Sequence, residues 1–258
     1  MSRQDWISDA MKRRLAAGDA ALGCSVMIPS PQMVEMVGHL GFDWVLVDME
    51  HGTIGIESAE LMIMAAQACG ISAIVRPPGN RSAEISAVMD RGAHGVQVPH
   101  VNSAEDARRA VAAVKFGAGA QRGLAAGTRP DRYGLGESMP DFVSRSNAAT
   151  LVCVQIEHEQ AVLAIDELLD VESVDVYFIG PSDLSQSMGH PGNPKAPPVA
   201  NAIDSTLRRI VTAGRIPGMP ATSHGVAALL DQGVRYIYTH LPRLLQAGGN
   251  EFLRAAGR

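Results

Sequence analysis

Charged and polar side chains recur in the sequence at the points where apolar runs end. In VLVDMEHG (45–52), branched apolar residues are followed at once by Asp48, Glu50 and His51. Other apolar runs end in Arg76, in His100, in Gln155 with Glu157, and in Gly180-Pro181-Ser182-Asp183. Carboxylates bind divalent cations, histidine transfers protons near neutral pH, and arginine stabilises oxyanions. For Glu50 taken alone we favour a solvated loop, but recurrence at five of eight apolar runs predicts one shared site.

Two carboxylates, Glu157 and Asp183, are the candidate metal ligands. The sequence has no paired histidine spacing and its 3 cysteines lack a C-x-x-C spacing, so the pattern favours a hard divalent cation with oxygen ligands. An aspartate after a Pro-Ser pair is also a common helix N-cap, and Asp183 suits the start of the turn DLSQS equally well. The residue types leave both roles open.

Short apolar runs alternate with amphipathic segments along nearly the whole chain. The predicted strands are 21–28, 43–50, 72–77, 95–100, 151–157, 174–180, 216–221 and 234–240. The predicted helices are 4–17, 31–41, 57–69, 81–91, 103–114, 139–147, 160–169, 198–213, 223–232 and 242–256. Apolar strands that alternate with helices indicate a parallel sheet, and eight such units in about 250 residues predict an α/β fold, the (β/α)8 TIM barrel. A doubly wound open sheet is the competitor, but no G-x-G-x-x-G follows the first predicted strand.

The barrel prediction gives the polar run ends a common location. Active sites of such barrels lie at the face where the strands end, which is where these side chains fall. The connection at 115–150 is long for a compact domain, and such loops are usually functional or mobile. We predict one domain over 1–258, with a leading N-terminal helix. Its C-terminal helix, at 242–256, has an apolar face larger than one barrel needs and is expected to serve in oligomer contacts.

Composition excludes several classes of protein. Hydrophobic residues make up 46% and charged residues 19% of the chain, which is typical of a globular protein with a substantial core. A net charge of −5 without a Lys/Arg cluster argues against nucleic acid as a partner. The sequence shows no signal peptide or membrane-length apolar run, so we expect a cytoplasmic protein without a membrane partner. Cys24, Cys69 and Cys153 lie among apolar residues and are predicted to be small buried hydrophobes.

Some further residues receive structural interpretations. Met62 and Met64 are predicted to lie in the core. His94 follows Ala93 in a turn between helix and strand and is predicted at the surface. Arg122 and the segment 129–133 lie in the long connection, where closure over a substrate and a solvated surface are equally compatible with the sequence.

Several motifs resemble those of one enzyme family, the class II, metal-dependent pyruvate aldolases of the HpcH/HpaI family. These motifs are DMEH at 48–51, VRP at 75–77, MDRGAHGVQVPHV at 89–101, QIE at 155–157 and FIGPSDLSQSMGH at 178–190. They occur in family order within a region from about residue 20 to about residue 245. The resemblance implies a barrel of the phosphoenolpyruvate/pyruvate type. It also implies a homo-oligomer, often a hexamer with exchanged terminal helices.

The resemblance further implies which residues hold the metal and the pyruvyl group. Glu157 and Asp183 match the family's ligands for Mg²⁺, Mn²⁺ or Co²⁺, and Gln155 lies beside them. Pro181 and Ser182 belong to the segment that resembles the family's binding site for the pyruvate carboxylate.

The same resemblance assigns the residues of the reaction itself. Arg76 matches the arginine that contacts the pyruvyl oxygen. His51 matches the catalytic histidine, and Asp90 matches the aspartate that pairs with it. Asp48 matches a residue near the acceptor end of the site.

The implied reaction is the reversible cleavage of a 4-hydroxy-2-oxo acid to pyruvate and an aldehyde. The metal and Arg76 stabilise the enolate in this scheme, so no Schiff-base lysine is required. The lysines of the chain, Lys12, Lys115 and Lys195, indeed fall outside the predicted strand ends.

The sequence departs from the family pattern at two positions, and two other functions compete with that of an aldolase. Many members have a small residue where Met49 stands and an apolar residue where His100 stands, which affects the expected acceptor. One rival is another metal-enolate lyase of the CoA-ester type, which is expected to carry a basic patch for the nucleotide phosphates. The other is a non-catalytic barrel that binds an oxo acid, against which the complete set of site residues argues.

Overall fold

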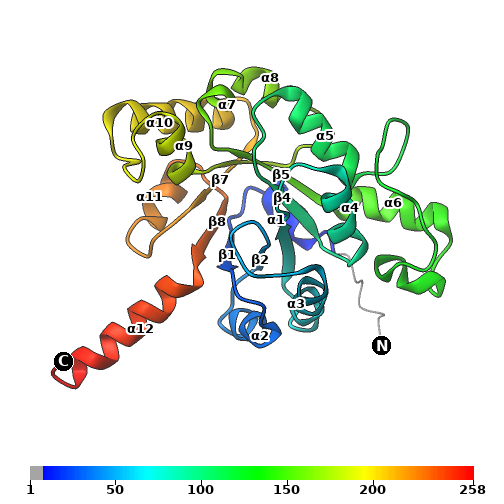
Figure 1. Ribbon diagram of the computed structural model, residues 1–258, viewed down its shortest axis with the longest axis horizontal. Coiled ribbons are helices and arrows are strands. Elements are labelled where there is room, and N and C mark those ends of the chain that lie inside the picture. Colours follow the sequence, from blue (N-terminus) through cyan, green and yellow to red (C-terminus); the bar gives the residue numbers. More distant parts are fainter. Residues whose placement is uncertain (1–7) are drawn as a thin grey trace.

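The computed structural model describes residues 8–258 and contains a closed barrel of eight parallel strands (Figure 1). The strands are β1 (Ala21–Val26), β2 (Trp44–Asp48), β3 (Ser72–Arg76), β4 (Gly95–Val98), β5 (Leu151–Ile156), β6 (Val176–Ile179), β7 (Ile216–Pro220) and β8 (Tyr236–His240). Each strand pairs with the next in sequence, and β8 closes the barrel by pairing with β1. The predicted (β/α)8 fold is confirmed.

Helices surround the barrel in Figure 1. They are α1 (Ala10–Ala16), α2 (Pro31–His39), α3 (Ile56–Ala68), α4 (Ser82–Asp90), α5 (Ala104–Val114), η1 (Arg129–Gly134), α6 (Met139–Ala149), α7 (Glu159–Leu163), α8 (Ile165–Leu169), α9 (Pro181–Ser187), α10 (Pro197–Thr212), α11 (Val226–Asp231) and α12 (Leu241–Ala255). The segment predicted as one helix at 160–169 is two helices, because Ala164 leaves the helical region with φ −88° and ψ 10°. Residues 4–7 of the predicted first helix lie outside the described residues.

Aromatic side chains fill the interior of the barrel. The rings of Trp44 and Tyr236 lie 4.2 Å apart, and the rings of Phe178 and Tyr238 stack at 5.2 Å. Gly23 is required beside them, because a Cβ atom there would lie 2.3 Å from the Trp44 ring. Buried side chains of α1 pack against this cluster, so α1 closes the end of the barrel where the strands begin.

The packing of α3 corrects one prediction. Met62 is fully buried against the barrel, as predicted, but Met64 is exposed. Residues two apart on a helix are separated by about 200° around its axis and therefore face opposite sides.

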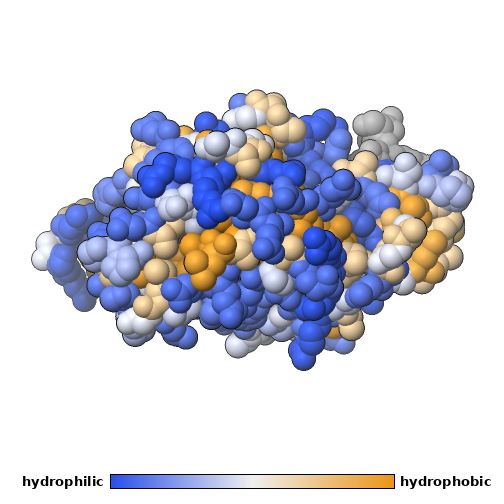
Figure 2. All heavy atoms as spheres, turned by 90° about the horizontal axis from the view of Figure 1, so that it is seen from above, coloured by the Kyte–Doolittle hydropathy of each residue, from blue (hydrophilic) through white to orange (hydrophobic). Residues whose placement is uncertain are grey.

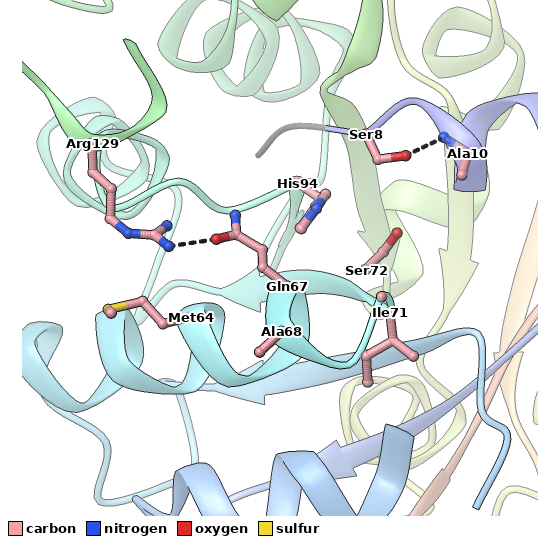
Figure 3. A pocket seen from close by; sticks show the side chains of 10 residues that line it. Ser8, Ala10, Met64, Gln67, Ala68, Ile71, Ser72, His94 and Arg129 are labelled. Carbon is pink, nitrogen blue, oxygen red and sulfur yellow. Dashed lines mark hydrogen bonds between the residues drawn. The ribbon is translucent and has the colours of Figure 1, made fainter. Parts of the chain in front are cut away.

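The predicted surface position of His94 is wrong. Its side chain is 5% exposed, and its Nδ1 accepts a hydrogen bond of 3.0 Å from the backbone N–H of Ala73. The His94 backbone continues the ladder, because its N–H donates to the Ala73 carbonyl and its carbonyl accepts from Leu151. Figure 3 shows His94 beside a cavity of about 390 Å³ that Arg129 and Gln67 also line. Burial, followed by the charge of Arg129, lowers the pKa of His94 to about 4.

His94 should make the protein less stable as the pH falls. The unfolded histidine binds a proton below about pH 6.5, but the folded one does so only below about pH 4. Stability is therefore lost between these values, by about 3 kcal/mol in total. Denaturant unfolding at pH 7 and pH 4.5 should show a smaller loss in His94→Asn, whose Oδ1 can accept from Ala73. The exposed His39→Asn is the control, and an equal loss in wild type and His94→Asn contradicts the assignment.

The long connection 115–150 is anchored on the outside of the barrel by buried arginines. Arg122 donates to the Val114 carbonyl at 3.1 Å, to Ser146 Oγ at 3.3 Å and to Asp90 Oδ1 at 3.2 Å. Arg129 is also buried and lies in the cavity beside Ser72, the first residue of β3. These arginines therefore have structural contacts, and Arg129 lies toward the barrel end opposite the predicted site.

The last helix, α12, projects from the barrel (Figure 1). Leu241 is its one buried residue among those described, whereas Leu245, Phe252 and Leu253 are exposed. The surface view in Figure 2 is largely hydrophilic and carries several apolar patches. None of the helices formed by residues 8–258 combines the length and the apolar character that a membrane span requires.

Candidate active site

A buried ion pair at the ends of β2 and β3 forms the base of the site. Asp48 and Arg76 are partners in the strand register, which places their side chains at the same height in the barrel. Arg76 donates from Nε to Asp48 Oδ1 at 2.9 Å and from Nη2 to Asp48 Oδ2. Burial disfavours the charged guanidinium, but the bonds and charge of Asp48 outweigh it and raise the pKa of Arg76. The arginine is therefore held charged and in one orientation.

Asp48 also organises the turn that follows β2. Its Oδ1 accepts from the backbone N–H groups of Glu50, at 3.1 Å, and His51, at 3.2 Å. With no exposed surface and both oxygens engaged, Asp48 positions Arg76 and this turn. The place of Asp48 near the acceptor end of the site, as a substrate-binding residue, stays a prediction.

The turn brings Glu50 back toward Arg76, so the solvated-loop interpretation of Glu50 is wrong. Glu50 Oε2 lies 3.1 Å from Arg76 Nη1, and the side chain is 9% exposed. Burial raises the pKa of Glu50; the charge of Arg76 opposes this rise and that of Glu157 adds to it. The spacing Asp48-x-Glu50 could have indicated the position of Glu50, because the aspartate accepts hydrogen bonds from the backbone of the turn that carries the glutamate.

Glu50, His100 and Glu157 converge on one point. One potential ligand atom from each lies within 4.8 Å of the others. His100 Nε2 is 3.1 Å from Glu50 Oε1, and His100 Nδ1 is 3.4 Å from Glu157 Oε1. The His100 backbone, at φ 57°, lies in the left-handed region, and its N–H donates to Glu157 Oε1 at 2.7 Å. His100, which had no predicted role, therefore lies between two carboxylates.

These three residues fit a divalent cation. Glu50 Oε2 pairs with Arg76 by charge but makes no hydrogen bond, and the Glu50 carboxylate faces a second negative charge on Glu157 that a cation between them would offset. Two carboxylates and an imidazole are suitable ligands for Mn²⁺ or Co²⁺, and the carboxylates suit Mg²⁺. The site is thus able to hold a metal beside the Arg76 guanidinium.

Gln155 joins the arginine to the metal group. The side chain is 1% exposed, and its Oε1 faces Arg76 Nη1 at 3.4 Å. Its Nε2 donates to Glu157 Oε2. The predicted location of Gln155 beside Glu157 agrees with this contact, and its contact with substrate stays a prediction.

His51 lies at the outer edge of the same turn. Its side chain is 50% exposed, and Nε2 lies 3.7 Å from Glu50 Oε2. The predicted pairing with Asp90 is absent among residues 8–258, because Asp90 binds the buried Arg122 at 3.2 Å. A buried guanidinium requires a counter-charge, and Asp90 supplies it. The imidazole of His51 thus reaches solvent and Glu50.

The start of α9 lies against Glu157. A Cβ atom on Gly180 would lie 3.0 Å from Glu157 Cβ, a tight contact that glycine avoids. Ser182 and Asp183 follow in the first turn and are exposed. Asp183 is not one of the three converging residues, and its role as a metal ligand stays a prediction. The substrate contacts of Pro181 and Ser182 also stay predictions.

Known proteins resemble this chain over most of its length. The sequence profile of the family described as HpcH/HpaI aldolase/citrate lyase matches residues 22–233. The 4-hydroxy-2-oxo-heptane-1,7-dioate aldolase of Klebsiella pneumoniae subsp. pneumoniae is 34% identical over 250 residues, 96% of this chain and 94% of that protein. The structure of an HpcH/HpaI aldolase/citrate lyase family protein from Burkholderia cenocepacia J2315 superposes with a TM-score of 0.91 at 25% identity, covering 97% of this chain and 100% of that one. For the HpcH/HpaI aldolase from Desulfitobacterium hafniense DCB-2 the TM-score is 0.86 at 26% identity, covering 95% of each chain.

Proposed function

The chain belongs to the HpcH/HpaI aldolase/citrate lyase family and is a carbon–carbon lyase, and we propose that it cleaves a 4-hydroxy-2-oxo acid reversibly to pyruvate and an aldehyde. One observation carries the proposal: a fixed guanidinium adjoins two carboxylates and an imidazole at the ends of the strands. The guanidinium is the group that stabilises an enolate oxygen, and the other residues form a metal site.

The cofactor in this proposal is Mg²⁺, Mn²⁺ or Co²⁺. Glu50, His100 and Glu157 would hold it, with Asp183 from the start of α9 as a further ligand. A bound divalent cation supplies Lewis-acid stabilisation of the negative charge that develops on the 2-oxo oxygen.

The protein residues divide the remaining work of cleavage. His51 accepts the proton of the C4 hydroxyl, because it is the exposed imidazole at the rim of the site. The C4 oxygen then forms the aldehyde carbonyl as the C3–C4 bond breaks, and the bonding electrons pass through C2 to the former keto oxygen. The enolate takes up a proton from solvent at C3 to give pyruvate, and His51 returns the C4 proton to solvent. Arg76 stabilises that oxygen through Nη1, the part of the guanidinium not bound to Asp48. The backbone N–H groups of Ser182 and Asp183, in the segment that begins at Pro181, hold the pyruvate carboxylate.

Pyruvate release from a 4-hydroxy-2-oxo acid, followed through lactate dehydrogenase, tests the proposal. We expect release that stops after chelation and returns with Mg²⁺, Mn²⁺ or Co²⁺. A lyase of the CoA-ester type would instead cleave only CoA esters, and a non-catalytic barrel would bind pyruvate without turnover. Screening aldehydes against pyruvate in the reverse direction identifies the acceptor.

The proposal includes a homo-oligomer, with a hexamer as the expected form. The apolar face of α12 is uncovered at Leu245, 62% exposed, and Phe252, 75% exposed. A groove of about 760 Å³ at the base of α12, lined in part by Phe42, Ile237 and Leu244, offers an apolar surface for a second copy. Burial of such an apolar face favours association.

Light scattering at micromolar concentration should therefore report an oligomer. Phe252→Glu should shift it toward monomers, because a charge would be buried in the contact. Leu163→Glu places the same charge at an exposed leucine of α7 and is the matched control. A monomeric wild type, or an oligomer indifferent to Phe252→Glu, contradicts the proposed role of α12.

A further inference from the structure

A chain of hydrogen bonds runs through the interior of the barrel to Glu157. Tyr236 Oη lies 3.0 Å from Gln97 Oε1, Gln97 Nε2 bonds to Gln155 Oε1, and Gln155 Nε2 bonds to Glu157 Oε2. The four side chains come from β8, β4 and β5 and from the residue after β5, and each is 5% exposed or less. Buried amides and hydroxyls are costly unless they are paired, and here every link is made.

The charge of Glu157 determines the direction of every bond in the chain. An ionised carboxylate only accepts, so Gln155 must present its NH2 group to Glu157. Its Oε1 then faces Gln97, which must donate through its own NH2 group. The remaining Gln97 Oε1 accepts from the Tyr236 hydroxyl, which donates. No other assignment of the two amides satisfies all four groups.

This order fixes the orientation of the Gln155 amide. Arg76 also donates to Gln155 Oε1, but at 3.4 Å that bond is long and weak. Gln97 is the closer donor and holds the oxygen away from Glu157. A reversed amide would place Oε1 against the carboxylate, where two acceptors repel each other.

We propose that Gln97 and Tyr236 are positioning residues of the metal site. They act through Gln155, whose NH2 group holds the Glu157 carboxylate in the orientation that binds the cation. The inference rests on the metal site of the proposed function. Partners that orient a metal ligand from behind typically contribute about 10- to 100-fold to metal affinity.

Binding of Mn²⁺ to the apo protein, measured from the EPR signal of the free ion, tests this without any turnover. Gln97→Leu replaces the amide by an apolar group of similar size. Because Gln97 acts on the ligand through Gln155, we expect Mn²⁺ affinity to fall about tenfold, the lower end of that range. The same substitution leaves the Tyr236 hydroxyl buried without a partner, so the melting temperature should fall as well.

The double variant Gln97→Leu/Tyr236→Phe separates the two effects. Both partners of the Tyr236 bond are now apolar, so the melting temperature should recover in part, whereas Gln155 Oε1 still lacks its Gln97 donor and Mn²⁺ affinity should stay weak. Recovery of both quantities would mean that the chain serves stability alone and would overturn the proposal. Unchanged affinity in Gln97→Leu would also overturn it, with the proposed function intact. If wild type binds no Mn²⁺, the metal site of the proposed function fails together with the inference.

Discussion

Glu157→Gln is expected to lower pyruvate release by about three decades or more and to weaken Mn²⁺ binding. The substitution keeps the shape of the side chain but removes one of the negative charges that would hold the cation. A divalent cation contributes several kcal/mol of charge stabilisation in such reactions, and each 1.36 kcal/mol is about tenfold in rate. Steady-state pyruvate release and Mn²⁺ titration of the same preparations measure the two losses.

The control for this variant is Glu159→Gln, which removes the same charge two residues further on, at an exposed position in α7. Both its activity and its Mn²⁺ affinity should equal those of wild type. Wild-type activity in Glu157→Gln after the metal has been stripped and replaced would remove Glu157 from the metal site.

The second large effect is a difference between Arg76 and His51. Arg76→Ala should lower cleavage and the exchange of pyruvate methyl protons alike, by about two to three decades, because both reactions pass through the enolate. His51→Ala should lower cleavage by about two to four decades, the usual contribution of a general base. Its effect on exchange should be smaller, because no C4 hydroxyl takes part in that reaction. Proton NMR of pyruvate in D2O and the pyruvate-release assay provide the two rates.

Folding must be controlled in the Arg76 series. Arg76→Ala leaves the carboxylate of Asp48 buried without its cation, which typically costs about 3–5 kcal/mol. Arg76→Lys keeps the charge but loses the two-bond contact with Asp48, and it should show the same pattern in a folded protein. Arg81→Ala, at an exposed position, is the matched control. Equal losses of cleavage and exchange in His51→Ala would assign both proton transfers to His51 and contradict the division of roles.

The barrel was predictable because its signal is repeated along the chain. Each predicted strand overlaps an observed one, and each observed strand ends one or two residues earlier than predicted, as at Asp48, or at the same residue, as at His240. Strands buried on both faces are continuous apolar runs, so their number and order can be read from the sequence alone. The ends of the predicted strands then placed Arg76, Gln155 and Glu157 at the same end of the barrel.

The misjudged residues depend on contacts between segments that are distant in sequence. Glu50 looked like part of a solvated loop because nothing local shows that the Asp48 turn points it at Arg76. His94 looked exposed because its partner is a backbone N–H on the neighbouring strand. Asp90 is paired with Arg122, which lies in the long connection 115–150. The periodicity of the sequence did not specify the path of that connection.

The resemblance to the family assigned roles to several residues, and the observed contacts agree with some of these roles better than with others. Arg76, Gln155 and Glu157 lie together as expected. His100 joins Glu157 and Glu50, although the resemblance assigned it no role in metal binding. Local sequence patterns carry no information on whether an exposed side chain such as Asp183 reaches a cation.

Exchange of the pyruvate methyl protons in D2O measures metal-dependent formation of the enolate, because this reaction needs the metal and pyruvate but no acceptor aldehyde. The wild-type protein is stripped with a chelator, reloaded with Mg²⁺, Mn²⁺ or Co²⁺, and followed by proton NMR with pyruvate as the only substrate. We expect exchange in the reloaded protein and none in the stripped protein. Exchange that persists at full rate without metal, or that never occurs with any of the three ions, would contradict this expectation.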